Sequence, residues 1–134
     1  MAEIKIFNPD GMSKPAPYSH VAYAKTQELV FVAGQTPIDA AGAVVGTGDF
    51  EAQCAAVFAN IHTALRAVKA DWKNVVQFTT YLVRPQDAAA YRAYRARVYP
   101  QMFADGAYPP HTLLIISRLA DEAYLLEVQT VAAL

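Results

Sequence analysis

Glu127 is the side chain whose surroundings point most directly to chemistry. It lies in an apolar run, between Leu125-Leu126 and Val128. Carboxylates are rarely buried unless they are paired or functional. The pattern therefore has two interpretations: a sheet-edge glutamate that reaches solvent, or a carboxylate that accepts and donates a proton during a reaction.

Two other residue types, histidine and cysteine, bear on function. His111 follows Pro109-Pro110 and opens a strand-like segment, so it is either a capping or surface histidine or a substrate anchor or acid/base held by a stiff loop. Cys54 falls on the apolar stripe of a helical segment, which predicts a buried small hydrophobe rather than a nucleophile. His20 and His62 have no partners at ligand spacing, and we predict no metal site.

Arginines and tyrosines alternate in one segment, a mixture that also occurs in RNA-binding proteins. The chain has 11 Lys and Arg against 12 Asp and Glu, a formal net charge of −1. Because nucleic-acid binders usually carry a basic excess, we predict a solvated helix face with tyrosines packed inward and no nucleic-acid partner. The residues concerned are Arg92, Arg95 and Arg97 with Tyr91, Tyr94 and Tyr99.

The elements that position these residues belong to one predicted domain, residues 1–134. Hydrophobic residues make up 54% of the chain and charged residues 17%, against typical values of about 45–50% and about 25%. Periodicity and turn residues predict strands over residues 4–7, 22–25, 29–33, 75–83, 112–119 and 124–133. They predict helices over residues 49–70 and 87–99, the second ending at Pro100. The order predicts an α+β fold with two helices packed on one face of a sheet.

The second face of this sheet also needs a cover. In residues 124–131, alternation places Tyr124, Leu126, Val128 and Thr130 on one side and Leu125, Glu127, Gln129 and Val131 on the other. Residues 113–116 are apolar on both sides, which is typical of a strand buried on both faces. Since two helices on one face leave the other uncovered, we predict a partner subunit there.

The termini and the cysteine content bear on location. The N-terminal segment lacks a long apolar region, and no run reaches the ~18 apolar residues of a membrane span. A single cysteine excludes an internal disulfide and fits a reducing compartment. We expect a cytoplasmic protein with no membrane association.

Several segments, taken in order along nearly the whole chain, resemble the RidA/YjgF family. They are APYS (16–19), FVAGQTP (31–37), GDFEAQ (48–53), NI (60–61), VVQFTTYL (75–82), PPHT (109–112) and LEV (126–128). The resemblance implies a chorismate-mutase-like α+β fold and a homotrimer whose sheets form a central barrel, with ligand clefts between subunits. It also implies hydrolysis of reactive 2-imino acids to 2-keto acids and ammonia, with no metal or organic cofactor.

The resemblance also implies site residues. Tyr18 matches the family's pocket tyrosine, Gly34 the glycine whose backbone lines the pocket, and Glu127 the carboxylate that positions the attacking water. His111 stands where the family has an arginine that holds the substrate carboxylate, and Ala33 replaces a serine. Arg92 aligns with a pocket asparagine on the second helix and would restore a positive charge from another direction.

These differences shape the functional expectation. Losing a charged hydrogen bond to a carboxylate costs about 1.5–3 kcal/mol, so we expect weak 2-imino acid deaminase activity. The leading hypothesis is a trimeric hydrolase of a small imine, enamine or related carbonyl-derived metabolite. A non-catalytic metabolite-binding trimer is the alternative. Endoribonuclease or translation-inhibitor activity, historically attached to family relatives, is disfavoured by the net charge.

Overall fold

Strands and helices follow one another in the predicted order. The computed structural model describes residues 2–134. The elements are β1 Glu3–Phe7, β2 Val21–Lys25, β3 Leu29–Gln35, α1 Phe50–Ala67, the 3-10 turn η1 Trp72–Asn74, β4 Val75–Leu82, α2 Asp87–Met102, β5 His111–Ile115 and β6 Leu126–Ala133.

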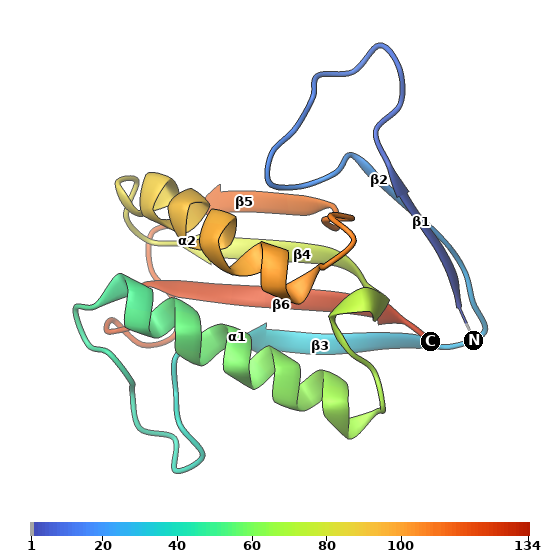
Figure 1. Ribbon diagram of the computed structural model, residues 1–134. Helices are drawn as coiled ribbons and strands as arrows, with labels where there is room; N and C mark the ends of the chain where they lie inside the picture. Colours follow the sequence, from blue (N-terminus) through green and yellow to red (C-terminus); the bar gives the residue numbers. More distant parts are fainter. Residues whose placement is uncertain (1) are drawn as a thin grey trace.

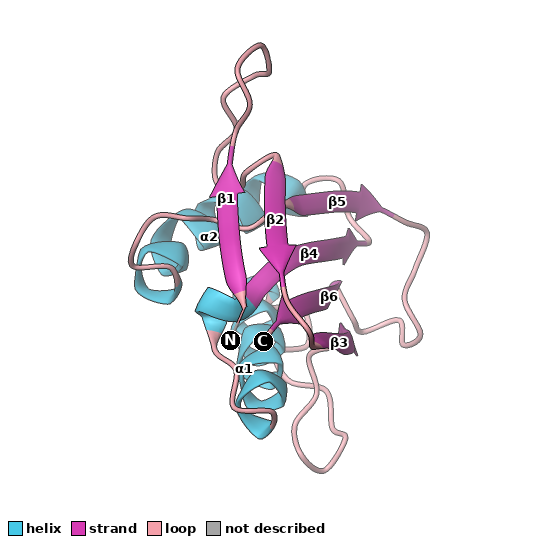
Figure 2. Ribbon diagram, turned by 90° about the vertical axis from the view of Figure 1, so that its right-hand side faces the viewer, coloured by secondary structure: helices cyan, strands magenta, loops and turns pink. Residues whose placement is uncertain are grey.

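The main sheet is mixed, with the strand order β3-β6-β4-β5. β4 and β5 are parallel, whereas β6 runs antiparallel to both of its neighbours. Figure 1 shows α1 and α2 side by side on one face of this sheet. β1 and β2 form a separate antiparallel hairpin that stands across one end of the sheet strands (Figure 2). The predicted α+β fold with both helices on one face is confirmed.

Alternation along β6 decides which side chains meet the helices. Leu126, Val128 and Thr130 are buried beneath the helices, whereas Gln129 on the other face is exposed and Glu127 is half-buried. The register pairs Thr80 of β4 with Val128 and Tyr81 with Glu127. The period-two prediction is therefore confirmed from Leu126 to Val131, whereas Tyr124 and Leu125 lie before β6 and Leu125 packs into the core.

The face of the sheet opposite the helices is open and partly apolar. Phe31 is 72% exposed and Leu29 55% exposed on β3, and Leu114 is 38% exposed on β5. Exposed aromatic and aliphatic side chains in one place mark an interaction surface more often than scattered single residues do. We refer to this surface, formed by Leu29, Phe31, Leu114 and their neighbours on β4 and β6, as the open face.

Side chains of α1 hold the backbone next to both strands of the predicted site. The buried Gln53 amide accepts from the Leu125 N–H at 2.8 Å and donates to the Ala123 carbonyl at 2.8 Å, just before β6 begins. Asn60 donates to the carbonyls of Thr36 and Ile38 just after β3. One helix therefore positions the start of β6 and the end of β3.

Several element ends differ from the predicted ones, most clearly in the two helices and the last two strands. α1 stops at Ala67 instead of residue 70 because Lys69 takes a left-handed backbone with φ 62°. α2 continues through Pro100 to Met102, because Phe103 then donates to the Tyr99 carbonyl and packs into the core. β5 ends at Ile115 and β6 begins at Leu126, so the residues between them form a longer loop than expected.

No helix in the described part of the chain is both long and apolar enough to cross a membrane.

Replacing Gln53 by leucine tests this anchoring. Gln53→Leu keeps the side-chain volume roughly constant but leaves the buried Leu125 N–H and Ala123 carbonyl without partners. We expect the free energy of unfolding, measured by urea denaturation, to fall by about 1–3 kcal/mol. Gln101→Leu, on the exposed side of α2, is the control and should change it by less than about 0.5 kcal/mol. Equal effects of the two substitutions would contradict the anchoring role.

Candidate functional site

Glu127 and Gly34 lie directly against each other on neighbouring strands. A Cβ atom built on Gly34 would stand 2.0 Å from Oε1 of Glu127 and 2.8 Å from its carboxyl carbon. Real Cβ contacts are essentially never so short, so a side chain at position 34 would have to displace the Glu127 carboxylate. The glycine therefore allows the close approach of the carboxylate to the β3 backbone, and we treat the two residues as one unit.

The Glu127 carboxylate is free to act on a bound molecule. It is half-buried on the same side of the sheet as the open face. Within residues 2–134 the structure gives it no hydrogen bond or ion pair, although Gly34 packs against one of its oxygens. A half-buried carboxylate with open acceptor positions can orient a water molecule and take a proton from it.

His111 lies on the opposite side of the same sheet. It pairs with Phe78, whose side chain is buried under the helices, whereas Glu127 pairs with Tyr81 on the open side. Two strand spacings and three residues along the strand separate their backbones by roughly 14 Å. One small substrate cannot touch both side chains within a single protomer.

His111 belongs to a chain of hydrogen bonds under α2. Arg95 Nη1 lies 3.0 Å from His111 Nδ1, and His111 Nε2 lies 2.9 Å from Thr80 Oγ1, which in turn lies 2.9 Å from the Tyr91 hydroxyl. A guanidinium only donates, so Nδ1 accepts and the ring proton is on Nε2. The imidazole is thus neutral, with its tautomer determined by Arg95.

The direction of the pKa shift of His111 agrees with a neutral imidazole. Burial, together with the positive charge of Arg95, lowers the pKa of His111 from 6.5 to about 3. A neutral imidazole whose two nitrogens are both engaged has no charge to offer a substrate carboxylate. By itself His111 does not replace the arginine that the resemblance led us to expect.

Arg95 is the residue that the sequence analysis missed. It was assigned to a solvated face, but it is only 4% exposed, and its guanidinium carbon lies 4.6 Å from the centroid of the Tyr91 ring. Arg92 and Arg97 are exposed as expected, and Tyr91, Tyr94 and Tyr99 are buried. The signal was present in the spacing, because Arg95 is four residues from both Tyr91 and Tyr99 and so shares their inward stripe.

Two of the predicted site residues remain apart from the others in the protomer. Arg92 is exposed on α2. Tyr18 is half-buried in the β1–β2 loop, which projects from the body in both ribbon views (Figures 1 and 2), and its ring packs edge-on against His20 at 5.8 Å. In the described part of the chain no hydrogen bond joins either residue to Glu127 or His111.

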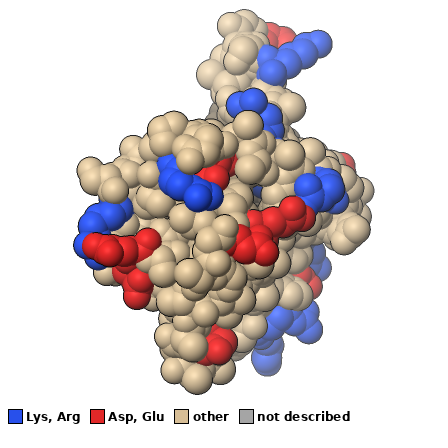
Figure 3. Space-filling model, turned by 90° about the vertical axis from the view of Figure 1, so that its left-hand side faces the viewer, with Lys and Arg blue, Asp and Glu red and all other residues tan. Residues whose placement is uncertain are grey.

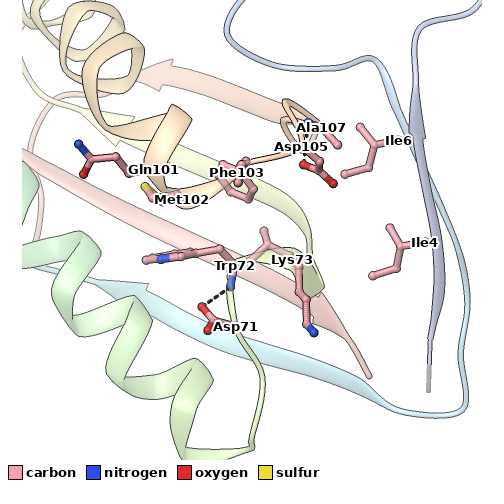
Figure 4. A pocket seen from close by; sticks show the side chains of 12 residues that line it. Ile4, Ile6, Asp71, Trp72, Lys73, Gln101, Met102, Phe103, Asp105 and Ala107 are labelled. Atoms are coloured by element: carbon pink, nitrogen blue, oxygen red, sulfur yellow. Dashed lines mark hydrogen bonds between the residues drawn. The ribbon is translucent and has the colours of Figure 1, made fainter.

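A cavity of about 530 Å³ lies elsewhere, beside the β1–β2 hairpin. Figure 4 shows Ile4 and Ile6 reaching from β1 toward Trp72, Lys73 and Phe103. None of the predicted site residues lines it. We assign the site to the Gly34–Glu127 unit instead, because its carboxylate keeps open acceptor positions toward a bound molecule. The Asp71 carboxylate on its wall is already bound by His62, Arg66 and Trp72 N–H.

The remaining candidates for chemistry have structural roles or are absent. Cys54 is completely buried, and desolvation raises the pKa of its thiol to about 12, in agreement with the predicted core position. Within residues 2–134 there is no group of three His, Cys, Asp or Glu side chains able to hold a metal ion.

Comparisons with known proteins agree with one another. The sequence model of the family described as Endoribonuclease L-PSP matches residues 11–134. A RutC family protein of Pyrococcus abyssi is 31% identical over 132 residues, 98% of each chain. A RutC family protein of Synechocystis is 31% identical over 107 residues, 79% of this chain and 78% of that protein.

Solved structures extend the likeness to the fold. The crystal structure of YyfB from Yersinia pestis, described as a protein of unknown function of the conserved Rid protein family, matches with a TM-score of 0.85 and 30% identity, covering 98% of each chain. The YjgF gene product from E. coli matches with a TM-score of 0.69 and 18% identity over 88% of each chain, a likeness of fold alone.

The lowered pKa of His111 predicts how stability depends on pH. Above pH 6.5 the imidazole is neutral in both the folded and the unfolded chain, whereas between pH 6.5 and about 3 only the unfolded chain binds the proton. Stability should fall on acidification by up to about 1.4 kcal/mol per pH unit from this group. In urea denaturation at pH 7, 6 and 5, His111→Gln should flatten this slope relative to the parent chain. The control variant Gln101→Leu, on the exposed side of α2, should leave it unchanged, and equal slopes in all three proteins would contradict the assignment.

Proposed function

Because this chain belongs to the RidA/YjgF family, we propose that it is a homotrimer whose clefts hydrolyse a small imine, enamine or related carbonyl-derived metabolite. The observation that carries this proposal is the Glu127 carboxylate, held against Gly34 and without a hydrogen-bond or ion-pair partner among residues 2–134. A carboxylate in that state suits the activation of one water molecule. The proposal needs no metal or organic cofactor, and we retain the prediction of a cytoplasmic protein.

In the proposed hydrolysis of an imine, Glu127 is the only side chain that moves protons. The oxygen of a water molecule bonds to the imine carbon, while Glu127 accepts one of its protons and passes it to the nitrogen. Glu127 then takes the proton of the new hydroxyl group and passes it to the nitrogen as the carbon–nitrogen bond of the amino alcohol breaks, so that ammonia leaves and the carbonyl product remains. A single correctly placed carboxylate can serve as both base and acid in such a sequence.

A trimer explains why the protomer looks incomplete. The open face exposes Phe31 and Leu29 to solvent, and the Tyr18 loop projects from the body. Glu127 and the pair His111–Arg95 lie on opposite sides of the sheet. If the open face of one subunit packs near the β5–α2 edge of the next, each cleft gains Gly34 and Glu127 from one chain and His111 with Arg95 from its neighbour.

The surface charge supports a small-molecule substrate over a nucleic acid. On the face drawn in Figure 3, acidic and basic side chains are interspersed over a largely uncharged surface. The formal net charge is −1, whereas binding to a phosphate backbone depends on several clustered cations. The endoribonuclease in the family description is therefore not our proposal for this chain.

A coupled assay tests the activity. An amino-acid oxidase or threonine dehydratase generates imines, and semicarbazide reports how long they survive. We expect the protein to shorten imine lifetime and Glu127→Gln to reduce its rate by about 10²-fold or more, since general base catalysis contributes about 10²–10⁴-fold. Gly34→Ala should lower the rate as well, because its Cβ would displace the carboxylate.

The control for this assay is Glu122→Gln, an exposed carboxylate in the loop before β6 that pairs with Arg118. It should retain the parent rate. If no imine disappears faster in the presence of the parent protein, the hydrolase proposal is wrong, and saturable binding of a 2-oxo acid under those conditions would favour the metabolite-binding alternative.

A charged substitution on the open face tests whether the subunits assemble through it. Phe31→Glu places a carboxylate in the centre of the proposed subunit contact, where burying an unpaired charge is strongly unfavourable. By light scattering, the parent chain should have the mass of three copies and Phe31→Glu should shift toward one copy. Tyr23→Glu on the outer side of the hairpin, also exposed, is the comparison and should remain trimeric. A parent protein with the mass of one chain would overturn the trimer.

A further inference from the structure

The cavity beside the β1–β2 hairpin has no part in the proposed function. Its volume of about 530 Å³ lies within the range of about 300–1,000 Å³ that is typical of small-molecule sites. One wall is β1, and the other is the body of the protein where η1 and the end of α2 lie (Figure 4). Neither Gly34 nor Glu127 is among its lining residues. The cavity is therefore a second candidate binding site, separate from the Gly34–Glu127 unit.

The two walls of the cavity are apolar, and one of them is aromatic. The isoleucine side chains of β1, at positions 4 and 6, point toward Trp72 and Phe103 (Figure 4). The centroids of these two rings lie 6.4 Å apart, and the indole also stacks on His62 at 5.0 Å, which fixes its orientation. Aromatic rings attract one another beyond the area they bury. A flat ring placed between the walls would thus meet aliphatic groups on one side and aromatic groups on the other.

The charges along the cavity favour an anionic ligand. The Asp71 carboxylate on its wall is already bound by the histidine and the arginine of α1. The Asp105 carboxylate accepts a backbone N–H at 3.0 Å and lies on the side nearer Ile6 (Figure 4). The Lys73 ammonium, in contrast, takes part in no ion pair or side-chain hydrogen bond among residues 2–134 and lies apart from Asp105. The unused charge beside the apolar walls is therefore a cation.

We propose that this cavity binds an aromatic carboxylate, with the carboxylate at Lys73 and the ring between the isoleucines of β1 and the rings of Trp72 and Phe103. Such a ligand would also connect the hairpin to the body. In the described part of the chain β1 pairs with β2 alone, and a two-stranded hairpin by itself is only marginally stable. The binding site does not depend on the proposed hydrolysis, which uses other residues.

The chain has a single tryptophan, and it lines this cavity. A brominated ring in contact with Trp72 should quench its fluorescence, so quenching reports occupancy of this site. Titrations compare 4-bromophenylacetate with 4-bromophenylacetamide, which carries the same ring without the charge. We expect saturable quenching by both ligands. The acid should bind about two- to fivefold more tightly, as is typical of an ion pair that water still reaches, and added salt should reduce this ratio.

Variants assign the two parts of the ligand to the two parts of the cavity. Lys73→Gln should bring the ratio of the two affinities close to one and leave the affinity for the amide unchanged. The matched control is Lys14→Gln, an exposed lysine of the β1–β2 loop that does not line the cavity; it should keep the parent ratio. Ile4→Ala shortens the apolar wall and should weaken both ligands by a similar factor, so that the ratio stays constant.

Amide hydrogen exchange gives a second measurement, of the hairpin itself. If the ligand bridges the hairpin and the body, exchange of the β1 and β2 amides should slow as the site fills, by up to about tenfold at a ligand concentration ten times the Kd. The turn at residues 39–43, which lies outside the cavity lining, is the internal control and should exchange at an unchanged rate.

Three results would overturn the proposal. They are quenching of Trp72 that does not saturate with either ligand, equal affinities for acid and amide in the parent protein, and an unchanged ratio in Lys73→Gln. The outcome is separate from that of the imine assay. Saturable binding of the acid by a protein that hydrolyses no imine would refute the proposed function alone, and hydrolysis without such binding would refute this inference alone.

Discussion

The two-residue period of β6, carried through its pairing with β4, is the constraint on which the site depends. It places Val128 and Thr130 under the helices and Glu127 on the open face, and the register carries the same division to Thr80 and Tyr81. A slip of one residue would exchange all of these positions. Gln53 and Asn60 of α1 hold the flanking backbone, so the packing of one helix protects the register that presents the carboxylate.

Because the strands present their side chains to opposite faces of the sheet, the two candidate groups of one protomer lie on different faces. We call these groups, Gly34 with Glu127 and Arg95 with His111, the two half-sites. The Gly34–Glu127 unit has acceptors without donors to match, and the Arg95–His111 pair has donors without an anion. Neither half is satisfied by the described residues of its own chain. In the proposed trimer the cleft between two subunits would bring both together, with Glu127 holding the water near the reacting carbon of a small imine.

The residue pattern within single segments predicts much of the fold but little of the geometry of the candidate site. The burial of Cys54 in α1 and the alternation from Leu126 to Val131 follow from spacing within one segment, and both were predicted correctly. The pairing of Gly34 with Glu127 joins residues far apart in the chain, and only the family resemblance suggested it. The face of His111 depends on the parallel register of β4 and β5, which no local signal encodes. The sequence predicted Arg95 on the solvated face because arginine is charged, although its helical spacing matches that of the buried tyrosines. The rings of Tyr91 and Tyr99 make a buried guanidinium tolerable.

The most direct test of a site shared between subunits is complementation between two variants, one changed in each part of the proposed cleft, each of which should be impaired alone. Glu127→Gln and Arg95→Gln chains are unfolded together, refolded as a mixture and assayed for imine hydrolysis. Random assembly gives roughly a quarter of the clefts an intact Glu127 from one chain and an intact Arg95 from the next, so the mixture should regain about that fraction of the parent rate. If mixed trimers form and the rate stays at the level of the separate variants, the two half-sites do not meet across a subunit boundary and the account is wrong.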